Sequence, residues 1–157
     1  MVKNKLFEFA EGKADAVENP MGSSAVNDFY LSADMNCAES IIHAANTIYS
    51  LGIDDQVLRT ASGFGGGMGV GHLCGAVSDC IMAAGMLFVR ERAHESDVLQ
   101  IITAEFIERV EKHFNSLLCN DIQKSYYQEE SGCSQVVYEI AELFWDLVLE
   151  YDSKRVR

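Results

Sequence analysis

Residues 63–89 read GFGGGMGVGHLCGAVSDCIMAAGMLFV, a glycine-rich loop that leads directly into an almost wholly apolar segment. From residue 73 to residue 89 the only polar side chains, apart from two thiols, are those of Ser78 and Asp79. Apolar residues recur there every three or four positions, which is the helical period. A helix that is apolar nearly all round is either a membrane span or the buried centre of a bundle. Because this one is shorter than the about 20 residues that a bilayer requires and contains an aspartate, we predict a buried central helix over residues 73–89.

The rest of the chain is also expected to be helical. It contains a single proline and little strand signal. Asn36 followed by Glu39 has the pattern of a capping box, Asp54 is placed to cap a short helix, and Ser96 or Asp97 is placed to cap a long one. We expect an all-α fold, a compact bundle of about five helices around the central helix. The predicted organisation is a helical N-terminal appendage over residues 1–35 and a cysteine-containing helical domain over residues 36–151, within a single domain overall.

The composition and the N-terminal sequence indicate which partners and which cellular location to expect. The formal net charge of −12 argues against nucleic acid and against anionic membrane surfaces, because both select basic patches. The N-terminus lacks an apolar run of the signal-peptide type, so the expected location is the cytoplasm, where thiols stay reduced. Five cysteines in such a protein are more typical of metal ligands, redox groups or core residues than of a disulfide framework. An exposed apolar face on the N-terminal region would indicate a homodimer.

Four of the five cysteines fall near predicted helix ends. Cys37 and Cys74 lie at or near helix starts, Cys119 just after a helix end, and Cys133 just before the last helix. They could converge at one pole of the bundle, where helix N-termini favour thiolates. Cys80 follows Cys74 by six residues and points away from it on a helix, so we interpret it as a core residue. Without a Cys-x-x-Cys pair, spacing alone leaves a functional cluster and four unrelated buried thiols equally open.

The glycine loop contains Gly65, Gly66 and Gly67 but meets neither nucleotide-binding fingerprint. We therefore favour a tight crossing that lets the central helix dock, with a phosphate cradle as the alternative. His72, two residues before Cys74, is the histidine that we retain as a candidate fourth ligand or proton donor. A loop histidine without a special role is the favoured interpretation of the same residue.

The cysteine pattern resembles that of the C_GCAxxG_C_C family of redox-active proteins, over about residues 36–149. The matching residues are Asn36-Cys37-Ala38-Glu39, the run ASGFGGGMG at 61–69, Cys74-Gly75-Ala76, the run IMAAG at 81–85, Cys119 and Cys133. The resemblance implies that Cys37, Cys74, Cys119 and Cys133 are the defining cysteines, with Gly75 beside them. A related domain occurs in split-Soret cytochromes, which are associated with an iron–sulfur centre. The resemblance therefore implies a [2Fe-2S] cluster held by four thiolates as a candidate cofactor.

One position departs from the family pattern. Asp79 stands where the family has glycine, and the additional Cys80 follows it. A buried aspartate is strongly unfavourable unless it is paired or protonated, so we expect Asp79 to hydrogen-bond within the cysteine site or to face an oligomer interface.

The leading hypothesis is a redox-active protein with an unidentified electron-transfer partner. Its four cysteines would ligate an iron–sulfur cluster or cycle between dithiol and disulfide. The alternative is a structural or binding module whose cysteines hold zinc or only pack. The sequence does not decide whether the protein is an enzyme.

Overall fold

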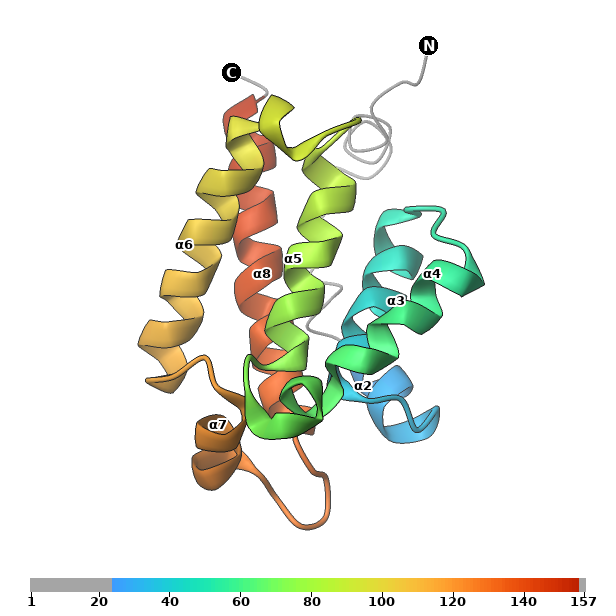
Figure 1. The fold of residues 1–157 in the computed structure, drawn as a ribbon, viewed down its shortest axis with the longest axis vertical. Coiled ribbons are helices and arrows are strands. Elements are labelled where there is room, and N and C mark those ends of the chain that lie inside the picture. Colours follow the sequence, from blue (N-terminus) through green and yellow to red (C-terminus); the bar gives the residue numbers. More distant parts are fainter. Residues whose placement is uncertain (1–23, 156–157) are drawn as a thin grey trace.

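The computed structural model describes residues 24–155 of the 157-residue chain, and they form an all-α fold (Figure 1). Its α-helices are α2 (Ser24–Asn27), α3 (Cys37–Tyr49), α4 (Asp55–Thr60), α5 (Gly75–Phe88), α6 (Asp97–Phe114), α7 (Cys119–Tyr126) and α8 (Ser134–Arg155). Short 3-10 or π turns lie between them at η1 (Asp28–Ser32), η2 (Ala61–Phe64), η3 (Gly67–Gly71) and η4 (Ala93–Glu95). The described residues contain no strand, so the predicted all-α class is confirmed.

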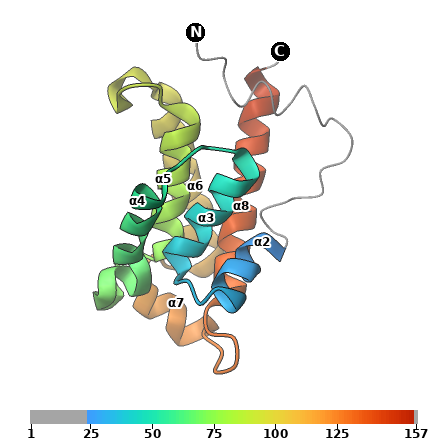
Figure 2. The ribbon, with the colours of Figure 1, turned by 90° about the vertical axis from the view of Figure 1, so that its right-hand side faces the viewer.

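Helix α5 lies at the centre of the bundle. It packs between α3 on one side and α6 and α8 on the other, as both views show (Figures 1 and 2). Val77, Cys80 and Ala83 on this helix are fully buried, whereas Met86 is 47% exposed, so one side of α5 reaches the surface. The prediction of a central helix is confirmed. The described part of the chain contains no helix long and apolar enough to cross a lipid bilayer.

Side-chain caps mark the starts of three helices, α3, α4 and α6. The Asn36 side chain accepts hydrogen bonds from the backbone N–H groups of Ala38 and Glu39, and the Glu39 carboxylate accepts one from the Asn36 N–H. This is the predicted capping box. Asp54 caps α4 and Ser96 caps α6, also as predicted. Helices α3, α5 and α8 all begin at the end of the bundle where α7 lies (Figures 1 and 2).

The described part of the predicted N-terminal appendage packs on the bundle. Helix α2 contacts α3 and α8, and Val26 is fully buried in the common core. Residues 1–23 of this appendage lie outside the described residues. The division of the chain at residue 35 therefore stays a prediction.

Helix α7 is absent from the helices that we expected. Helix α6 ends at Phe114, where Asn115 adopts a left-handed backbone with a φ of 57°, instead of continuing to the residue before Cys119 as expected. Cys119 then opens α7 and does not merely follow the end of α6. The segment has too little apolar periodicity to be predicted as a helix, because Ile122 is its one buried apolar residue other than the cysteine.

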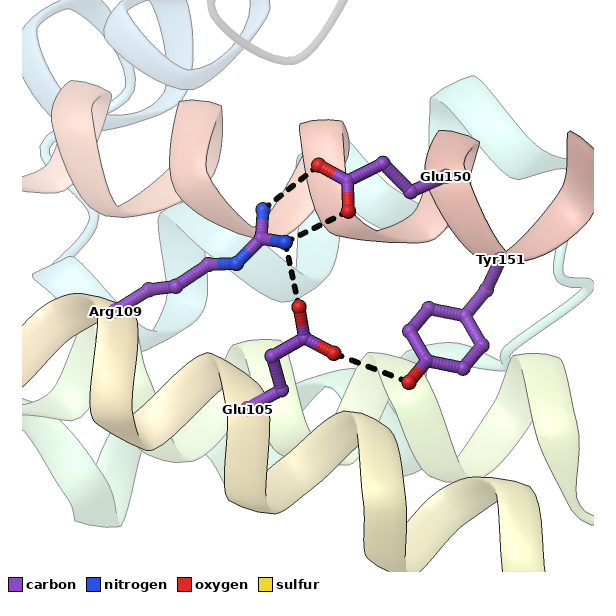
Figure 3. Close-up of polar contacts among 4 residues, drawn as sticks. All are labelled: Glu105, Arg109, Glu150 and Tyr151. Carbon is purple, nitrogen blue, oxygen red and sulfur yellow. Dashed lines mark hydrogen bonds and ion pairs between the residues drawn. The ribbon is translucent and has the colours of Figure 1, made fainter. Parts of the chain in front are cut away.

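A polar network joins α6 to α8 (Figure 3). Arg109 donates to Glu105 at 2.6 Å and to both carboxylate oxygens of Glu150 at 2.7 and 3.0 Å. The Tyr151 hydroxyl donates to the second oxygen of Glu105 at 3.0 Å. Two helices are thus held together by four polar side chains beside their apolar contact.

Candidate cysteine site

Four cysteines line one cavity of about 490 Å³ at the end of the bundle where α7 lies. Each one occupies the start of a different helix: Cys37 opens α3 and Cys119 opens α7, while Cys74 and Cys133 directly precede α5 and α8. We call this hollow the cysteine cavity. Because helix N-termini carry partial positive charge, all four thiols lie where a thiolate gains electrostatic support. Cys80 does not line the cavity and is fully buried in the core.

Two of these cysteines are brought together by backbone pairing. The N–H of Cys74 donates to the carbonyl of Leu117 at 2.9 Å, and the N–H of Cys119 donates to the carbonyl of His72 at 2.6 Å. Leu73 and Leu118 form an isolated antiparallel bridge between the same two segments. The start of α7 is therefore tied to the start of α5 by main-chain hydrogen bonds.

Glycine provides the space that the cysteines occupy at two points. A methyl group added at Gly75 would lie 2.8 Å from Cys37 Sγ and 2.7 Å from the Phe64 carbonyl oxygen. A methyl group added at Gly67 would lie 2.8 Å from Cys119 Cβ. Such separations are shorter than van der Waals contact allows, so the missing side chains let Cys37 and Cys119 approach. The favoured interpretation of the glycine loop, a tight crossing, agrees with this packing.

Asn36 connects Cys37 to the glycine loop. Its Nδ2 donates to the carbonyl of Ser62 at 3.1 Å, while its Oδ1 caps α3. A methyl group added at Gly65 would lie 2.6 Å from the Asn36 amide. The neighbouring Gly66 lines the cysteine cavity and has open space around it.

Cys133 is held by two side chains that we did not predict from the sequence. Its N–H donates to the Tyr30 hydroxyl oxygen at 3.0 Å, and the Gln123 amide donates to its sulfur at 3.8 Å. Both side chains line the cavity. Gln123 follows Cys119 by four residues, a helical spacing that would have been informative had α7 been recognised. Nothing in the sequence around Tyr30 indicates its role.

Burial and mutual proximity disfavour thiolates in the cavity. Burial, with the Cys37 and Cys119 thiols nearby, raises the pKa of Cys74 to about 12, although the N–H groups of Ala76 and Val77 oppose the rise. Burial also raises the pKa of Cys119, to which Cys37 and Cys133 contribute. The pKa of Cys133 is raised by burial and by Cys37, while the Gln123 hydrogen bond lowers it. These three thiols are therefore protonated at neutral pH unless a cation joins them.

Neither of the two predicted supporting side chains, those of His72 and Asp79, lines the cavity. His72 is exposed and contributes its backbone carbonyl, not its imidazole, to the arrangement of Cys119. Asp79 is fully buried on α5 and accepts a hydrogen bond from the Ser78 hydroxyl at 3.2 Å. It does not line the cavity, and its complete burial keeps it away from the protein surface.

The donor set of the cavity consists of four thiols. Within residues 24–155, no three His, Cys, Asp or Glu side chains are grouped closely enough to hold a single metal ion. A mononuclear zinc site requires about four ligands around one point. A [2Fe-2S] cluster divides its four thiolates between two irons, so it needs ligands that surround an elongated space. Four cysteines line the wall of one cavity, which matches the number of thiolates that such a cluster takes.

The fold and the cavity define a small all-α protein with a four-cysteine site. The profile of the family described as "Putative redox-active protein (C_GCAxxG_C_C)" matches residues 35–147, and the chain belongs to this family. Comparisons with curated proteins and with solved structures found no match.

Proposed function

We propose that this protein is an electron-transfer or redox-sensing protein whose Cys37, Cys74, Cys119 and Cys133 together ligate a [2Fe-2S] cluster. The observation that supports the proposal most is that four thiols from four helix starts line one cavity. The cluster would supply one-electron transfer. The chain would supply its ligands, its shielding from water and the partial positive charge of the helix ends.

The raised thiol pKa values support a cationic occupant. Four thiolates so close together repel one another, and burial removes the water that would otherwise stabilise them. Metal ligation requires deprotonated thiols and releases their protons, so bound irons would offset both penalties. The Cys74 thiol, which has a pKa of about 12, is protonated at neutral pH and would release its proton on ligation.

Dithiol–disulfide cycling is the second candidate. Cys37 and Cys133 are only half-buried, unlike Cys74 and Cys119, and are thus the pair that a reagent reaches first. Oxidation of this pair would release two protons and transfer two electrons to a disulfide of the partner, which would become two thiols. The pKa of Cys133, which burial and Cys37 raise, weighs against fast attack at neutral pH.

The test is anaerobic purification followed by a visible spectrum and assays of iron, zinc and acid-labile sulfide on the same sample. Cys37→Ser and Cys119→Ser remove thiols from the cavity, and Cys80→Ala is the matched control because Cys80 lies off the cavity. We expect iron and sulfide in equal amounts, lost in the two serine variants and retained in the control.

Other outcomes separate the alternatives. Zinc without sulfide would replace the cluster with a structural metal. A metal-free protein that loses a pair of reactive thiols on oxidation would favour the dithiol couple. Colourless protein whose thiols resist alkylation until it unfolds would overturn both redox mechanisms.

A further inference from the structure

The charge of the cysteine cavity comes from two carboxylates. Asp34 and Glu130 line it, and none of the described lining residues is lysine, arginine or histidine. The other titratable side chains on its wall are four thiols and Tyr30. Burial raises the pKa of Tyr30, so the phenol is neutral at physiological pH. The cavity therefore has an acidic wall without a compensating cation among residues 24–155.

Each of the two carboxylates lies close in sequence to one of the two more exposed thiols. Asp34 precedes Cys37 by three residues, and Glu130 precedes Cys133 by three. Cys37 and Cys133 are the half-buried pair, whereas Cys74 and Cys119 are buried. Any reagent that reaches these two thiols through the cavity thus enters a space whose wall carries both carboxylates.

Both acidic residues belong to segments with a defined backbone. Asp34 has a left-handed backbone with a φ of 55° and lies between η1 and α3. Glu130 lies in a turn closed by reciprocal backbone hydrogen bonds between Gln128 and Gly132, at 3.0 and 2.7 Å. The nearby Lys124 does not line the cavity and pairs with Asp121 at 3.0 Å. The net charge of the whole chain, −12, is negative as well.

We propose that the cysteine cavity selects a positively charged redox partner and excludes anionic ones, through Asp34 and Glu130. This inference rests on the proposed function, because it concerns which reagent reaches the cysteines. Clefts lined by charge of one sign concentrate ligands of the opposite sign and change their association rates by about 10-fold or more. Anionic thiols, phosphate esters and nucleotides are repelled, whereas a partner that presents lysine or arginine around its own redox group is attracted.

The experiment compares two variants that change net charge equally. Asp34→Asn with Glu130→Gln removes the acidic wall, and asparagine tolerates the left-handed backbone at position 34. Glu108→Gln with Glu111→Gln removes two exposed carboxylates from α6, neither of which lines the cavity. Any effect of overall charge alone therefore appears in both variants.

If the protein is isolated with a cluster, the rates of its oxidation by a cationic cobalt hexaammine and by anionic ferricyanide are measured. If it is isolated as thiols, the probes are cationic and anionic methanethiosulfonates. With these, the thiolate attacks the sulfenyl sulfur, forms a mixed disulfide and releases methanesulfinate. The measured quantity is the cation-to-anion rate ratio of each variant divided by that of the wild type, which cancels intrinsic differences between reagents.

We expect this normalised ratio to fall about tenfold at low salt in the cavity variant, and much less in the α6 variant. The difference should shrink as salt screens the charges. Equal ratios in the two variants overturn the charge selection while leaving the proposed function intact. A wild-type protein with neither an oxidisable cluster nor reactive thiols overturns both.

Discussion

Gly67 is the residue on which the approach of Cys119 most directly depends. A methyl group there would lie 2.5 Å from the backbone nitrogen of His72 and 2.8 Å from Cys119 Cβ. Gly66 has the same φ of +61° but nothing within 4 Å of an added methyl group. The two positions therefore share the same φ and differ in the space available.

We expect Gly67→Ala to destabilise the protein more than Gly66→Ala. Both variants incur about 1–2 kcal/mol for the left-handed backbone, and only Gly67→Ala adds about 1–3 kcal/mol for overpacking. Urea unfolding of both variants measures the difference. Equal losses would mean that the segments around Cys119 have room to move.

Asp79 is a fully buried carboxyl whose titration is coupled to folding. Burial raises its pKa from 3.8 to about 7, the Ser78 hydrogen bond opposes the rise, and the charge of Glu39 adds to it. Its Oδ1 has no hydrogen-bond partner. Because the folded state holds this proton more tightly than the unfolded state, the stability that it contributes is complete below about pH 4 and is lost as the pH rises to about 7.

Asp79→Asn removes this titration. We expect the variant to have a higher free energy of unfolding than the wild type at about pH 8, by up to about 4 kcal/mol, and a similar one near pH 4. Asp146→Asn, at an exposed position of α8, is the control and should change neither value appreciably. A wild-type stability that does not fall between these two pH values would contradict the raised pKa of Asp79.

At the scale of elements, the contribution of the polar network between α6 and α8 to stability can be measured directly (Figure 3). The Arg109 side chain is 27% exposed, and those of Glu105 and Glu150 are 34% and 46% exposed. Partly exposed ion pairs contribute little, so we expect Arg109→Met to lower the free energy of unfolding by about 1 kcal/mol. A double-mutant cycle with Glu150→Gln measures the coupling, and Lys112→Met on the same helix controls for loss of a cation. Coupling that persists at high salt would contradict this weak, screened interaction.

Sequence reasoning succeeded for elements whose starts depend on neighbouring residues. Asn36 with Glu39, and Ser96, mark helix starts because the cap and the N–H groups that it accepts from lie within one turn. Helix α7 could not be predicted in this way. Its first residue is fixed by a hydrogen bond to the carbonyl of His72, which belongs to another part of the chain.

At the scale of the whole molecule, the sequence predicted which cysteines lie near helix ends but not how they are arranged. Their gathering follows from the helix starts that meet at one end of the bundle, which only packing determines. Tyr30 contacts Cys133 across 103 residues of sequence, and no local pattern encodes such a contact. The site residues that sequence reasoning missed are those that depend on tertiary neighbours.

A bond between cysteines from different helices would constrain most of the described chain. We expect the occupied or oxidised protein to be more stable than the reduced, empty protein by about 2–5 kcal/mol, because a link between distant segments restricts the unfolded chain. Thermal unfolding before and after chelation or reduction measures the change. Cys133→Ser should abolish the difference, and Cys80→Ala should retain it. Identical melting of both forms would show that the cysteines are not joined in the isolated protein.

A link between cysteines at four helix starts would also affect the rate at which the protein is degraded. Proteases cleave chains that open, and the population of open chains falls as the free energy of unfolding rises. A molecule whose cysteines have lost their link would open more often and be degraded sooner, while linked molecules accumulate. The amount of protein in the cell would then depend on how oxidising its surroundings had been, even without a partner protein that binds the site.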